Sequence, residues 1–191
     1  MKKLIVILVL TVIFTGIDIN AQRTVVVKRN PNHTTVVKRT PRGRVVYVHN
    51  RRAVRTARVL PPKAVIIHHR NFKYYYHEGV YYKLYKGRYI IVPPPRGLRI
   101  RVLPPHHTRI VIGPRVIFYA GGVFYQEQDG QTDEYEVIEP PVGTIIYNLP
   151  EDAEEVTVDG NPYYEYDGVL YQQVSTDEDK SYEVACLLND E

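Results

Sequence analysis

The amino-acid sequence predicts an all-β protein: three tandem small antiparallel units of about five short strands each, after a signal peptide and a basic tail. The first observation is an aromatic phrase around a glycine that occurs three times, with Gly79, Gly122 and Gly168 spaced 43 and 46 residues apart. Repetition at about 20–50 residues is typical of tandem structural units. The second is a proline-rich break after each of the first two phrases, at residues 94–97 and 140–143. Because proline has no donor for a strand ladder, these breaks separate sheets.

Each aromatic phrase predicts a β-hairpin. The turn positions hold Glu78 and Gly79, Gly121 and Gly122, and Asp167 and Gly168. A two-residue type I′ turn needs positive φ at both positions, which favours glycine. Such turns place aromatic residues opposite one another in every copy: Tyr75 and Tyr82, Phe118 and Tyr125, Tyr164 and Tyr171. Cross-strand aromatic pairs contribute about 0.2–1 kcal/mol each relative to alanine pairs.

Residues 1–21 predict a secretory signal peptide. Lys2 and Lys3 precede an apolar run over residues 4–14, and we expect cleavage after Ala21. An uncleaved membrane anchor is the alternative, but the apolar run is shorter than the roughly 20 residues that a helical span needs. No later segment is apolar enough for a transmembrane segment. The protein is therefore expected to be exported, to the periplasm or the outer cell surface.

Residues 22–53 predict a basic, flexible tail. The segment carries nine Arg and Lys residues and no acidic residue, and Pro31 and Pro41 interrupt it. A segment of such charge density is expected to order only on a partner. The valine runs are also compatible with strands, and the residues leave that alternative open. The expected contacts of the tail with an anionic partner are Lys28, Arg29, Lys38, Arg39, Arg51 and Arg52.

The units are expected at residues 54–96, 97–142 and 143–191. Each begins with a strand that ends in Leu-Pro, at residues 54–60, 98–103 and 144–149. A second strand, the aromatic hairpin and a closing strand follow. A unit of this size buries little core alone, so the units are expected to pack together as meander sheets or to form SH3-like small barrels. The 17 tyrosines are expected to form core and sheet surface rather than a ligand platform.

The charges are sorted along the chain. Residues 22–115 carry 22 basic residues and one acidic residue, whereas residues 116–191 carry one basic and 19 acidic residues. One interpretation is two solvated faces. The other is a basic half that meets an anionic envelope polymer, such as lipopolysaccharide or an acidic glycan. Nucleic acid is disfavoured, because no nucleic-acid-binding motif is present. The opposite charges of the first and third units also predict weak head-to-tail self-association.

No motif predicts catalysis, a cofactor or a metal site. The chain has no nucleophile elbow, no phosphate-binding glycine loop and no His-Glu-x-x-His. The adjacent histidines at 68–69 and 106–107 point to opposite faces if they lie in strands, which disfavours chelation of one ion. Cys186 is the only cysteine and is interpreted as a small buried hydrophobe. Clustered carboxylates leave a carboxylate-dependent hydrolase as the enzymatic alternative.

The aromatic and proline phrases resemble an uncharacterised family of exported bacterial proteins, known only as a domain of unknown function. The resemblance covers about residues 59–186, and the segments that carry it are 74–82, 94–104, 140–150 and 163–171. Phe118 and Phe124 replace tyrosines of the pattern. The resemblance implies an all-β envelope protein and no catalytic residues. The expected function is therefore that of an exported, non-enzymatic cell-envelope protein with a structural or adhesive role. The alternatives are a binding module for an anionic envelope polymer and a carboxylate-dependent hydrolase.

Overall fold

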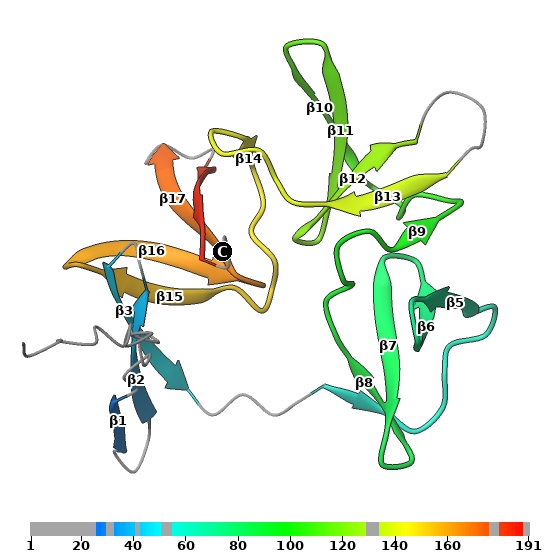
Figure 1. Cartoon of the computed structure of the whole chain (residues 1–191), viewed down its shortest axis with the longest axis horizontal. Coiled ribbons are helices and arrows are strands. Elements are labelled where there is room, and N and C mark those ends of the chain that lie inside the picture. Colours follow the sequence, from blue (N-terminus) through cyan, green and yellow to red (C-terminus); the bar gives the residue numbers. More distant parts are fainter. Residues whose placement is uncertain are drawn as a thin grey trace, which may run out of the picture.

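The computed structural model of the chain describes residues 26–29, 33–40, 43–50, 55–128, 134–175 and 180–188; in the first three ranges it describes the side chains of residues 44–47 only. Every regular element in these ranges is a β-strand, and the strands form three antiparallel sheets (Figure 1). The all-β prediction is confirmed. Within the described ranges there is no helix long and apolar enough to cross a membrane.

Units 1 and 2 are five-stranded sheets with the same strand order. Unit 1 runs β4-β8-β7-β6-β5, where the strands are β4 (Thr56–Ala57), β5 (Val65–His69), β6 (Phe72–His77), β7 (Val80–Tyr85) and β8 (Arg88–Ile91). Unit 2 runs β9-β13-β12-β11-β10, where the strands are β9 (Arg99–Ile100), β10 (Thr108–Ile112), β11 (Arg115–Ala120), β12 (Val123–Glu127) and β13 (Tyr135–Ile138). The described edge strands of each sheet are not bonded to each other. Of the two predicted forms, the units are meander sheets and not small barrels.

Unit 3 repeats this order and carries three further strands. Its own strands are β14 (Ile145–Ile146), β15 (Glu154–Val158), β16 (Asn161–Tyr166), β17 (Val169–Ser175) and β18 (Ser181–Leu187). Beyond β15 the sheet continues into the N-terminal strands β3 (Gly43–Asn50), β2 (His33–Thr40) and β1 (Val26–Arg29), which makes eight strands in all. Figure 1 shows the blue N-terminal strands beside the orange strands β15 and β16.

The strands β1 to β3 differ from the flexible tail that was predicted for residues 22–53. Tyr47 of β3 pairs with Val156 of β15, and Val45 pairs with Val158. Val45 is 0% exposed and Tyr47 is 5% exposed. The valine run forms a strand because unit 3 offers it an open sheet edge with apolar neighbours, an interaction that local charge density does not reveal. Arg51 and Arg52 lie outside the described residues.

The three hairpins have the register that their turn residues predict. Tyr75 pairs with Tyr82, Phe118 with Tyr125, and Tyr164 with Tyr171. Both residues of each turn have positive φ, from 46° at Glu78 to 91° at Gly79. These angles meet the requirement of a type I′ turn, whose twist matches that of the flanking strands.

One aromatic contact recurs in all three units. The first residue of each hairpin pair meets, edge to face, a tyrosine of the closing strand. The ring centroids are 5.1 Å apart for Tyr75 and Tyr89, 5.6 Å for Phe118 and Tyr135, and 5.4 Å for Tyr164 and Tyr182. This geometry contributes about 0.5–1.5 kcal/mol beyond the burial of the rings. The contact ties the hairpin to the closing strand of its own unit.

The main hydrophobic cores lie between successive units. The first core joins units 1 and 2 and contains Tyr74, Tyr76, Tyr81, Leu98, Ile100, Val123, Tyr125 and Val137. The second core joins units 2 and 3 and contains Ile117, Tyr119, Phe124, Ile146, Val169, Tyr171, Tyr182 and Val184. Because residues at matching repeat positions fill both cores, each unit is completed by the unit before it.

Candidate functional site

The hairpin turn of one unit docks on the Leu-Pro segment of the next. A Cβ added to Gly79 would lie 3.0 Å from Pro104 Cβ, and one added to Gly122 would lie 2.5 Å from Pro150 Cγ. Both glycines also have positive φ, so the turn and the close approach each require glycine. The same docking contact therefore joins unit 1 to unit 2 and unit 2 to unit 3.

A tyrosine hydroxyl reinforces each of these joints. Tyr76 lies three residues before Gly79 and donates a hydrogen bond to the backbone oxygen of Val102 at 3.1 Å. Tyr119 lies three residues before Gly122 and donates in the same way to the backbone oxygen of Asn148 at 2.5 Å. Each acceptor lies two residues before the docked proline. We call this combination of turn, proline and tyrosine hydroxyl the unit joint.

Unit 3 lacks the tyrosine of the unit joint. The corresponding position holds Glu165, whose carboxylate accepts a hydrogen bond from the backbone nitrogen of Gly168 at 2.8 Å, within its own turn. The turn of unit 3 instead approaches unit 1: Arg96 Nη2 lies 3.5 Å from Asp167 Oδ2. Burial raises the pKa of Asp167, and Arg96 opposes that shift.

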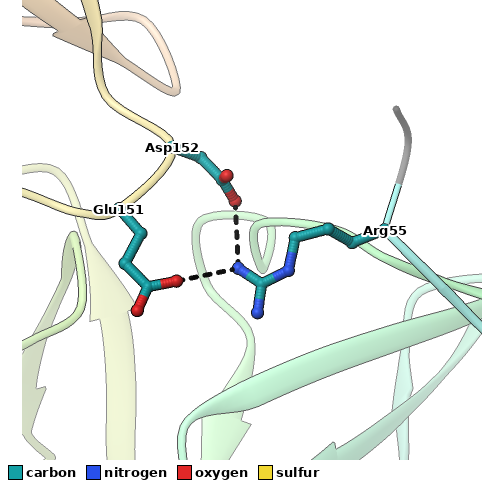
Figure 2. Close-up of polar contacts among 3 residues, drawn as sticks. All are labelled: Arg55, Glu151 and Asp152. Carbon is teal, nitrogen blue, oxygen red and sulfur yellow. Dashed lines mark hydrogen bonds and ion pairs between the residues drawn. The ribbon is translucent and has the colours of Figure 1, made fainter. Parts of the chain in front are cut away.

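A cleft of about 330 Å³ lies where the three units meet. Unit 1 lines it with Arg55 and the turn residues, unit 2 with Pro104, and unit 3 with Glu151 and Asp152. Figure 2 shows Arg55 between the two carboxylates, with its Nη1 atom 3.3 Å from Glu151 and 3.5 Å from Asp152. All three side chains are largely exposed, so each pair contributes only about 0–1 kcal/mol. These two carboxylates of unit 3 are therefore both paired with one arginine of unit 1.

The sorted charges of the sequence meet one another in the fold. Arg55 and Arg96 of unit 1 pair with carboxylates of unit 3, while Arg99 and Arg101 of unit 2 pair with Glu136 and Glu134. Arg44 of β3 donates its backbone N–H to Asp159 Oδ1 at 3.0 Å. Part of the charge asymmetry thus serves contacts between the basic and acidic halves of one molecule.

A group of basic and aromatic side chains lies at the surface of unit 1, and we call it the unit 1 patch: Phe72, Lys83, Tyr85, Lys86 and Arg88. All are exposed except Lys83, which is half-buried. Lys83 Nζ lies 4.2 Å from the ring centroid of Phe72, and Lys86 Nζ lies 5.3 Å from that of Tyr85. Phe72 and Tyr85 are 52% and 56% exposed, and Arg88 pairs across the strands with Tyr85. The exposed aromatic rings of such a group can contact the face of a sugar. The ammonium and guanidinium groups beside the rings can bind anions.

The sequence predicts anionic contacts in the tail, and the unit 1 patch is not among the residues that it predicts. Lys28 and Arg29 lie in β1, and Lys38 and Arg39 lie in β2, so their backbones belong to the eight-stranded sheet. The sequence feature that could have predicted the unit 1 patch is the mixture of lysine with tyrosine and leucine over residues 81–86. Because side chains alternate between the two faces of a strand, Lys83 and Tyr85 lie on one face of β7.

A groove of about 880 Å³ follows β15, β16 and β17 of unit 3. Glu154, Glu155, Tyr163 and Tyr164 contribute to its lining. The two glutamates are neighbours on one strand, so their carboxylates point to opposite faces and do not form a catalytic pair.

The histidines lie in separate places. His107 Nδ1 is 2.9 Å from the backbone oxygen of Pro104, and His77 Nε2 is 3.9 Å from Glu78. His68 and His69 lie in β5. Across the described ranges, no group of three or more His, Cys, Asp or Glu residues is arranged to hold a metal ion.

Residues 54–187 match the model of a family of unknown function, DUF6515. The match covers all three units and begins after β3. No curated protein and no solved structure matches the chain. The chain therefore belongs to DUF6515, a family of unknown function.

Proposed function

We propose that the protein is an exported, non-enzymatic component of the cell envelope whose three units act as a structural or adhesive scaffold. The observation that carries this proposal is the unit joint, formed by Tyr76 with Val102 and repeated by Tyr119 with Asn148. Repeated contacts between neighbours fix the spacing of tandem units and let them present an extended surface. The signal-peptide pattern of residues 1–21 supports export.

Export is tested by expressing the full chain in a Gram-negative host and separating cytoplasm, periplasm and envelope. The expected product is a chain that begins at Gln22, recovered outside the cytoplasm and retained on isolated envelopes. An uncleaved chain confined to the cytoplasm would contradict the proposal. Mass spectrometry of the N-terminal peptide distinguishes the two products.

The scaffold role is tested through the unit joint. The variant Gly122→Val crowds Pro150, whereas Gly121→Ala changes the neighbouring turn residue, at which an added Cβ meets nothing within 4 Å. Both variants are incubated with isolated envelopes, and the bound fraction is measured by sedimentation. Gly122→Val should lose retention while Gly121→Ala keeps it. If both variants fold and are retained equally, the unit joint is not needed for retention on the envelope, and the proposal is contradicted.

A second candidate function is the binding of an anionic envelope polymer, and the unit 1 patch favours it. Lys83 over the exposed ring of Phe72 combines a cation with an apolar platform. The test is retention on immobilised lipopolysaccharide or an acidic glycan during a salt gradient, since salt screens exposed charges. The triple variant Lys83→Gln, Lys86→Gln, Arg88→Gln should elute at lower salt than the wild type. Lys180→Gln, at an exposed lysine of unit 3, is the matched control.

Weak head-to-tail self-association stays a prediction. The basic unit 1 and the acidic unit 3 attract one another within the molecule through Arg55, and the same charges can act between molecules. Sedimentation velocity at low and physiological ionic strength distinguishes these cases. Association that appears only at low salt is expected, because the Debye length shrinks from about 30 Å at 0.01 M salt to about 8 Å at physiological strength.

A further inference from the structure

The strands β5, β10 and β15 occupy the same position in their units, at the edge of the five-stranded order. In unit 3 this edge accepts another strand: Thr157 of β15 pairs with Val46 of β3. The turn beyond β15 extends the contact, because the backbone nitrogen of Asp159 donates to the backbone oxygen of Arg44 at 3.2 Å. The fold therefore shows strand addition at one of three equivalent edges.

The corresponding edge of unit 2 is open. On the side of β10 away from β11, no strand lies beside it in the described part of the chain. Arg109 is exposed and Val111 is 57% exposed. Figure 1 shows the β10–β11 hairpin projecting away from the other two sheets. In unit 1, by contrast, the edge strand β5 contacts β9 of unit 2.

The register of the β10–β11 hairpin identifies which backbone groups are available. Ile112 and Arg115 flank the two-residue turn of Gly113 and Pro114, so they form a hydrogen-bonded pair. Bonding then alternates along the strand, and the N–H and C=O groups of Arg109 and Val111 point outward. Val111 occupies the position of Thr157, the residue of β15 that faces β3.

The charge around β10 is the reverse of that around β15. The basic strand β3 adds to a unit whose nearby carboxylates include Glu154, Glu155 and Asp159. β10 carries Arg109, and Arg115 lies opposite its last residue. The nearest acidic residue along the sheet, Glu127, lies on β12, beyond β11. An added strand at β10 therefore meets cations where β3 meets carboxylates.

We propose that the outer edge of β10 binds an extended polypeptide segment that combines aliphatic with acidic residues by β-strand addition. Main-chain hydrogen bonds to Arg109 and Val111 supply the pairing, and side-chain charge selects the partner. The binding surface is independent of the unit 1 patch and of the unit joint.

The test uses two eight-residue peptides on the full mature chain. One has the sequence of β3, and the other has the arginine and the histidine of that sequence replaced by glutamate. Fluorescence anisotropy should show the acidic peptide binding at least about tenfold more tightly than the basic one. Hydrogen exchange at β10 should slow when the acidic peptide is bound.

Two substitutions of one residue provide the variant and its control. Val111→Pro removes an outward N–H without removing a donor to β11, whereas Val111→Thr introduces the residue found in β15. The proline variant should bind the acidic peptide at least about tenfold more weakly, and the threonine variant should bind within about twofold of the wild type. If the proline variant does not fold, Arg109→Glu is the second variant. It should bind the acidic peptide more weakly and the basic peptide more tightly than the wild type.

Several results would overturn the proposal. One is no binding of the acidic peptide up to about 1 mM. Equal affinity of both peptides would remove the role of charge, and full affinity of a folded Val111→Pro variant would place binding elsewhere. A dimer that Val111→Pro abolishes would identify a second copy of this chain as the occupant instead.

Discussion

The hydroxyl groups of Tyr81 and Tyr125 lie 3.0 Å apart in the core between units 1 and 2. The matching positions in the core between units 2 and 3 are Phe124 and Tyr171, and phenylalanine has no hydroxyl. Tyr171 Oη is consequently buried without a hydrogen-bond partner in the described part of the chain. The two tyrosine hydroxyls of the first core are therefore hydrogen-bonded to each other, whereas the matching hydroxyl of the second core has no partner among the described residues.

The first prediction compares these two hydroxyls. Tyr125→Phe leaves Tyr81 buried without its partner and should lower the free energy of unfolding by about 1–3 kcal/mol. Tyr171→Phe removes a group that has no partner, so it should be neutral or stabilising. Urea denaturation of the two variants measures the difference. Equal losses would mean that the Tyr81–Tyr125 hydrogen bond does not distinguish the two cores.

The control for this prediction restores the missing hydroxyl. Phe124→Tyr should give Tyr171 a partner and raise the free energy of unfolding by about 0.5–1.5 kcal/mol. The gain should vanish when Tyr171→Phe is added, because no partner then remains. A gain that persists in the double variant would trace to packing and not to hydrogen bonding.

The second prediction concerns the unit joint. Both Gly121 and Gly122 have positive φ, so alanine at either position costs about 1–2 kcal/mol through the left-handed backbone. Only at Gly122 would a Cβ meet neighbours, at 2.5 Å from Pro150 and 2.6 Å from the Tyr166 ring. Gly122→Ala should therefore cost about 1–3 kcal/mol more than Gly121→Ala. Thermal or urea unfolding checks the ranking, which fails if Gly121 is the more sensitive.

The third prediction is alkaline unfolding. Burial raises the pKa of Tyr47 and of Tyr166 from 10.0 to about 12, with nearby carboxylates adding to each shift. Burial raises the pKa of Tyr119 and Tyr125 as well. Because the unfolded chain releases these protons more readily, the stabilisation is complete below pH 10.0 and is lost as pH rises through about 12.

Two signals measured against pH check this prediction. Absorbance at 295 nm follows tyrosine ionisation, and circular dichroism follows the sheets. A cooperative loss of sheet that coincides with a late group of ionising tyrosines is expected. Gradual ionisation of all 17 tyrosines near pH 10 in a folded protein would contradict it.

The fourth prediction concerns trypsin cleavage of residues 22–53, which differs between a flexible tail and a strand β3 that is paired with β15. A flexible tail predicts that trypsin trims the wild type to near Arg52 or Arg58. Pairing of β3 with β15 predicts that the bond after Arg44 is protected, since Val45 is fully buried. Val45→Asp should expose that bond by placing a charge in the core, whereas Val46→Thr on the opposite face should not. Limited digestion followed by mass spectrometry identifies the first site.

Local sequence was a good guide to the hairpins but a poorer one to the strands that open each unit. The run at residues 98–103 predicts a strand of six residues, and the structure has only Arg99–Ile100. The backbone oxygen of Val102 instead accepts a hydrogen bond from the Tyr76 hydroxyl of the preceding unit, and the turn that contains Gly79 packs against Pro104. An alternating pattern does not reveal that a backbone group is used by another unit.

What the sequence determined by itself is the set of three hairpins, their register and the aromatic pairs, because glycine and its neighbour settle the turn within a few residues. What only the tertiary structure decided is the use of the remaining groups: β3 on β15, Arg55 on Glu151 and Asp152, and Tyr171 without a partner. These contacts join residues far apart in the chain. They depend on which edges and charges the packed units leave open, and that is a property of the folded arrangement.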